Sequence, residues 1–157
     1  MRGSAHIKAL VDAFCARFGG DDLGITTAVD LAVLVAAADG TIDPDERAAL
    51  TASLEAIMGS TVALTVVRYL VREARNQIEA VGAEARARAI GGLLAANGAA
   101  DDGLRLALAI AFASDGLSAP EREVVSVVAK AAGASESRLE ALIAAAAAPR
   151  PAETEEA

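Results

Sequence analysis

Apolar residues recur at helical spacing along almost the whole chain. Within residues 44–58, for example, Leu50, Leu54 and Ile57 follow the i, i+4, i+7 spacing of one helix face. No segment alternates apolar and polar residues in the manner of a half-buried strand. The pattern therefore predicts an all-α fold of about seven helices. They are expected at residues 5–18, 26–38, 44–58 with a helical continuation over 60–80, 83–96, 104–114 and 119–132, before a final helix capped by Ser135 or Ser137.

Several segments have a predicted place in this fold. The segments 26–38 and 104–114 are apolar nearly all round, which is typical of buried central helices. Residues 97–103 are expected to form a loop in which Asp102 caps the following helix. In the segment 60–80, apolar side chains are expected to face the core and arginines the solvent. The inward set comprises Val62, Val66, Tyr69 and Leu70.

The chain also contains an internal repeat. Residues 27–50 and 103–126 each run from an apolar, alanine-rich stretch through Asp-Gly and a polar loop into Glu-Arg and a second helix. The second loop is one residue shorter. Such a duplication suggests two copies of a helix-loop-helix unit related by a pseudo-two-fold axis.

Composition and charge narrow the class of protein. Apolar residues make up 54% of the 157 residues and aromatic residues 3%, so the core is expected to be aliphatic. A net charge of −8 argues against nucleic acid and anionic membrane surfaces as partners. This negative charge is compatible with a cation or a basic protein as the binding partner. Residues 5–148 are expected to form one domain and residues 149–157 a disordered acidic tail.

The cysteine content and the length of the apolar stretches predict the cellular compartment of the protein. A single cysteine, Cys15, rules out an intramolecular disulfide and fits a reducing compartment. The N-terminus lacks the apolar core of a signal peptide, and no stretch of about 20 apolar residues could span a membrane. The sequence therefore predicts a cytoplasmic protein without direct membrane insertion.

The two polar loops combine helix caps with acids in unusual places. Asp43 and Glu46 suit the cap and third helical position of one helix, and Ser118 and Glu121 those of the other. Asp39 and its counterpart Asp115 instead follow buried helices. At a helix C-terminus the dipole disfavours an acid by roughly 0.3–1 kcal/mol. Either the aspartates form Asx-turns with the following glycine, or a bound cation neutralises them.

The sequence gives little support for an EF-hand, a zinc site or a catalytic site. An EF-hand would place its first ligands on Val35 and Ala37, inside an apolar helix. With His6 as the only histidine, neither a zinc site nor a catalytic triad is favoured, and an enzyme is the least favoured class. The arginines at positions 68, 72, 75, 86 and 88 read as a solvated face, with docking of an acidic partner as the alternative.

The paired motifs AAADGTIDPDERAAL and AFASDGLSAPEREVVSVVAKAAGAS resemble the TerB-like family of tellurite-resistance proteins. The N-terminal domain of DjlA-type co-chaperones belongs to the same broad group. The resemblance covers residues 5 to about 145. It implies an all-helical fold with internal pseudo-symmetry and a role in resistance to tellurite, other chemical stress and phage. It implies no established catalytic activity.

The resemblance also implies a site. Family members are thought to bind divalent metal ions through acidic residues of the duplicated loops and to work with membrane-bound and other cytoplasmic proteins. Only oxygen ligands are present, so Ca²⁺ or Mg²⁺ is expected before a soft metal. The alternative is a metal-free helical interaction module whose acidic loops are only caps. The ligand candidates carried over are Asp39, Asp43, Glu46, Asp115 and Glu121.

Overall fold

The computed structural model describes residues 2–19, 22–38, 40, 42, 44–58, 64–114 and 116–148. This part of the chain contains eight helices and no strand, so the predicted all-α single domain is confirmed with one helix more than expected. None of the described helices has the length and apolar character needed to cross a bilayer. The helices are α1 (Arg2–Ala16), α2 (Asp22–Ala36), α3 (Pro44–Met58), α4 (Leu64–Val81), α5 (Ala83–Ala96), α6 (Ala100–Ser114), α7 (Ala119–Ala131) and α8 (Glu136–Ala147).

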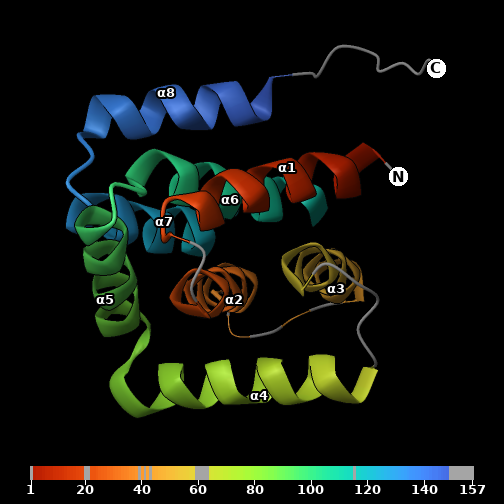
Figure 1. Ribbon diagram of the computed structural model, residues 1–157. Helices are drawn as coiled ribbons and strands as arrows, with labels where there is room; N and C mark the ends of the chain where they lie inside the picture. The colour runs from red at the N-terminus through yellow and green to blue at the C-terminus, as the bar shows by residue number, and fades with distance from the viewer. Residues whose placement is uncertain are drawn as a thin grey trace.

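The helix α2 lies at the centre of the molecule. In Figure 1 it is seen end-on, with α1 and α6 above it, α3 beside it, α5 on the other side and α4 across the bottom. All residues from Leu31 to Ala36 are buried. In α6, Leu104, Leu106 and Leu108 are also fully buried. As predicted, the two helices that are apolar nearly all round form the middle of an aliphatic core.

The helix α6 begins earlier than predicted. Residues 97–103 were expected to form a loop capped at Asp102, but Asp102 lies inside α6. Its side chain is 12% exposed and accepts a hydrogen bond from the guanidinium of Arg17 at 2.7 Å. The short connection before α6 turns at Gly98, whose φ is 63°. The ion pair with Arg17, which directly follows α1 and is 85 residues away in sequence, thus replaces the predicted cap.

The predicted inward face of α4 was wrong at two positions. Val66 is 40% exposed and Tyr69 is 55% exposed, whereas Val71 and Ala74 are buried. Both sets of residues satisfy helical spacing, because apolar residues occur on more than one side of this helix. Packing of α4 against α2 selects the face that carries Val71 and Ala74. The expected position of Val62 lies outside the described residues.

Candidate functional site

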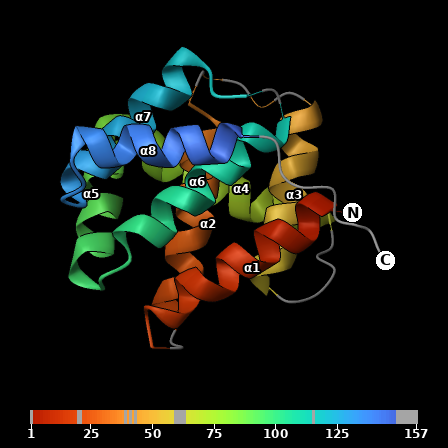
Figure 2. The ribbon, with the colours of Figure 1, turned by 90° about the horizontal axis from the view of Figure 1, so that it is seen from above.

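The two Asp-Gly loops follow the two central helices, which pack against each other. Figure 2 shows the described parts of the α2–α3 and α6–α7 connections along the same edge of the molecule. Gly40 has a φ of 94° and Gly116 a φ of 96°. This left-handed region favours glycine over residues with a side chain. The chain therefore turns in the same way at the glycine of each loop.

The structure describes only some of the predicted ligands. Asp39, Asp43 and Asp115 lie outside the described residues. Glu46 belongs to the first turn of α3, but its side chain is not among those described. Within the described part of the chain, no three His, Cys, Asp or Glu side chains are grouped so that they could hold a metal ion. The assignment of these acids as ligands therefore stays a prediction.

Glu121 is the one predicted ligand whose side chain is described, and it caps α7. Its Oε1 accepts the backbone N–H of Ser118 at 3.0 Å, and the Ser118 hydroxyl accepts the N–H of Glu121 at 3.3 Å. Glu121 is only 4% exposed. Leu117, directly before the cap, packs against the core. The predicted capping box is confirmed, so one oxygen of this carboxylate already has a structural role.

We expect Glu121→Ala to lower the free energy of unfolding by about 1–2 kcal/mol, because it leaves the Ser118 N–H without its acceptor. Glu121→Gln keeps a carbonyl oxygen in place and should cost less than half as much. Urea unfolding of both variants in EDTA measures the difference. Equal losses would show that the charge of Glu121, rather than the hydrogen bond, stabilises this helix end.

The first loop is tied to α4. The guanidinium of Arg75 donates a hydrogen bond to the carbonyl oxygen of Gly40 at 3.3 Å, and the N–H of Gly40 donates to the Ala37 carbonyl at 2.9 Å. Ile42 packs against the core from the same loop. Sequence reasoning placed Arg75 on a solvated face. No local signal could have found its contact with Gly40, which lies 35 residues earlier.

Among the described residues, the groups with shifted pKa values lie outside the two loops. Burial raises the pKa of Asp30 above its ordinary value, although Arg86 donates to it at 2.7 Å. The hydrogen bond from Arg138 lowers the pKa of Asp101. Burial also raises the pKa of the Cys15 thiol, which disfavours the reactive thiolate. The shifts of both aspartates are explained by burial and by ion pairs between helices, and neither marks a general acid or base.

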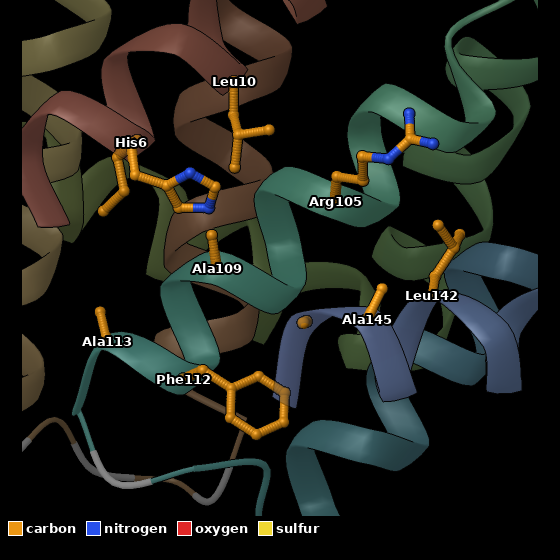
Figure 3. Close-up of a pocket in the computed structure, with 10 residues that line it drawn as sticks. His6, Leu10, Arg105, Ala109, Phe112, Ala113, Leu142 and Ala145 are labelled. Atoms are coloured by element: carbon orange, nitrogen blue, oxygen red, sulfur yellow. The ribbon is translucent and has the colours of Figure 1, made fainter. Parts of the chain in front are cut away.

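A separate cavity of about 400 Å³ opens between α1, α6 and α8. Figure 3 shows Ala109 and Phe112 of α6 and Ala145 of α8 among its lining, with His6 of α1 at one side. His6 and Arg105 are the only ionisable residues among those that line it. Sequence reasoning missed this cavity because three helices far apart in the chain enclose it. Its chemistry suits apolar contact rather than catalysis.

Comparison with known proteins agrees with this architecture. The family model described as "Tellurite resistance protein TerB" matches residues 26–144, which extend from α2 into α8 and include both Asp-Gly loops. No curated protein and no solved structure matches the chain. The family match covers well over half of the sequence and includes the repeated motifs that organise the fold. The chain therefore belongs to the TerB family of tellurite-resistance proteins.

Proposed function

We propose that this chain is a non-enzymatic, cytoplasmic stress-response protein that binds a divalent cation through its duplicated Asp-Gly loops. The observation that carries the proposal is the matching turn at Gly40 and Gly116, with φ values of 94° and 96°, after two buried helices in contact. Membership of the tellurite-resistance family supports the stress-response role. The proposed ligands are Asp39, Asp43, Glu46, Asp115 and Glu121.

A cation would resolve an electrostatic conflict in this arrangement. Asp39 and Asp115 follow the C-terminal ends of helices, where the carbonyl dipoles repel a negative charge. Carboxylate and carbonyl oxygens suit a hard cation such as Ca²⁺ or Mg²⁺. Loop one contains more carboxylates than loop two, where Glu121 also caps α7, so loop one would supply more of the ligands of a shared site. Binding would change the surface that protein partners contact, membrane-associated stress-response proteins among them.

A thermal melt tests the cation site. Protein stripped with EDTA is melted alone and with Ca²⁺, Mg²⁺, Mn²⁺ or Zn²⁺. At a concentration of about 100 times Kd, a ligand of the folded state adds about 2.7 kcal/mol of stability, so we expect the melting point to rise by about 5–10 °C with Ca²⁺ or Mg²⁺. Asp39→Asn and Asp115→Asn should abolish this rise.

The control is Glu84→Gln, which removes one exposed carboxylate from α5, where Glu84 pairs with Arg88 of the same helix. This variant should keep the full response to the cation. An equal loss in the control and in the loop variants would point to nonspecific screening of the net charge. A flat response of the unmodified protein to all four metals would reject the cation site.

The second candidate is a metal-free helical interaction module. The Ser118–Glu121 capping box favours it, because the box gives one of the predicted ligands a purely structural role. In that case EDTA leaves the melting point unchanged, while Asp39→Ala lowers it without any metal present by removing an Asx-turn acceptor.

A further inference from the structure

Four arginines line one cleft between α3 and α4. Arg47 comes from α3, and Arg68, Arg72 and Arg75 occupy successive turns along one face of α4. The cleft has a volume of about 290 Å³. We call it the arginine cleft. Its complete lining is Arg47, Arg68, Val71, Arg72, Arg75, Asn76 and Glu79.

These arginines differ from the other arginines of the molecule. Each of the six other arginines with a described side chain pairs with a carboxylate, whereas no described carboxylate lies within 4.0 Å of a cleft arginine. The pairs outside the cleft are Arg17–Asp102, Arg86–Asp30, Arg88–Glu84, Arg105–Asp102, Arg122–Glu140 and Arg138–Asp101.

The positive charge of the arginine cleft is opposite in sign to the net charge of the whole protein. The chain has 22 acidic and 14 basic residues, yet four of the basic ones converge here beside a single glutamate, Glu79. Converging like charges repel one another across a cleft. Arg75 is half-buried and is held in place by the Gly40 carbonyl, so it is not simply directed into solvent. Among the described side chains, none forms an ion pair with these four arginines, and a bound anion would balance their charge.

We propose that the arginine cleft binds a small, doubly charged oxyanion of the phosphate type. Guanidinium groups donate paired hydrogen bonds that match the spacing of phosphate oxygens. A cleft of about 290 Å³ has room for one phosphate group. The phosphate is supplied either as a free ion or by a phosphorylated side chain of a partner protein.

Calorimetric titration of the full chain tests this site. The probes are inorganic phosphate and a phosphoserine peptide, at pH 8 and at constant ionic strength adjusted with chloride. EDTA is present, so the result is independent of the cation site. We expect Arg68→Gln and Arg72→Gln each to weaken binding about tenfold or more, because each removes a charge-assisted hydrogen bond. Arg75 is left unchanged because it also anchors Gly40.

Arg88→Gln is the matched control, since it removes the same charge from an exposed helical position whose partner, Glu84, lies on the same helix. It should change the Kd less than twofold. Similar affinity for phosphate and for the phosphopeptide would identify the free ion as sufficient, and tighter peptide binding would identify a phosphorylated partner. Absence of binding by both probes, equal weakening in the control, or equal binding of a peptide with glutamate in place of phosphoserine would overturn the proposal.

Discussion

Phe14→Ala is expected to lower the free energy of unfolding by about 3–5 kcal/mol. Phe14 is fully buried, and its ring lies 5.0 Å from that of Phe18. It belongs to α1, which packs against α3 and α6 but precedes the segment that matches the family model. Loss of the ring leaves a cavity between these helices that the aliphatic core cannot fill without moving. The effect would be a large share of the stability of a typical domain, about 5–15 kcal/mol.

Urea unfolding followed by circular dichroism measures this loss. Tyr69→Ala is the control, because Tyr69 is an aromatic residue on a helix but is 55% exposed. Its removal should change the free energy of unfolding by no more than about 0.5 kcal/mol. A loss below about 1 kcal/mol for Phe14→Ala would mean that α1 is not an integral part of the folded domain.

Gly91→Ala should destabilise the protein by about 1–3 kcal/mol, although alanine is the better helix former. Gly91 lies on α5 where this helix packs against α7. A Cβ atom at this position would lie 2.5 Å from the Cβ of Ala131 and 2.6 Å from the carbonyl oxygen of Val128. The backbone oxygen cannot move aside as a flexible side chain could, so the two helices must separate.

The neighbouring glycine provides the control. A Cβ atom on Gly92 would meet no atom within 4 Å, because this residue faces solvent. Gly92→Ala should therefore raise the free energy of unfolding by about 0.5–1 kcal/mol through helix propensity alone. Thermal melts of the two variants should shift in opposite directions. Stabilisation by both would contradict the close approach of α5 and α7.

These two glycines illustrate what could and could not be predicted. Both weaken the helix 83–96 by propensity, and a single sequence gives no means of telling them apart. Only the path of α7 past α5 makes Gly91 necessary and Gly92 replaceable. The neighbouring sequence of Asp102 likewise favoured a helix cap. Only the tertiary structure shows that Asp102 instead pairs with Arg17.

The sequence by itself determined the features that depend on neighbouring residues. Helical periodicity predicted the all-α fold, the apolar segments 26–38 and 104–114 predicted its centre, and the spacing of Ser118 and Glu121 predicted the cap of α7. Helix caps and turns depend on residues only a few positions apart, so they can be predicted from a single sequence.

The tertiary structure decided everything that depends on how helices face one another. Packing against α2 turned Tyr69 outward and Val71 inward. Arg47 of α3 and three arginines of α4 line one cleft, although sequence reasoning had assigned those α4 arginines to a solvated face. Helical spacing fixes which residues share a face, but which face is buried depends on surfaces contributed by distant parts of the chain.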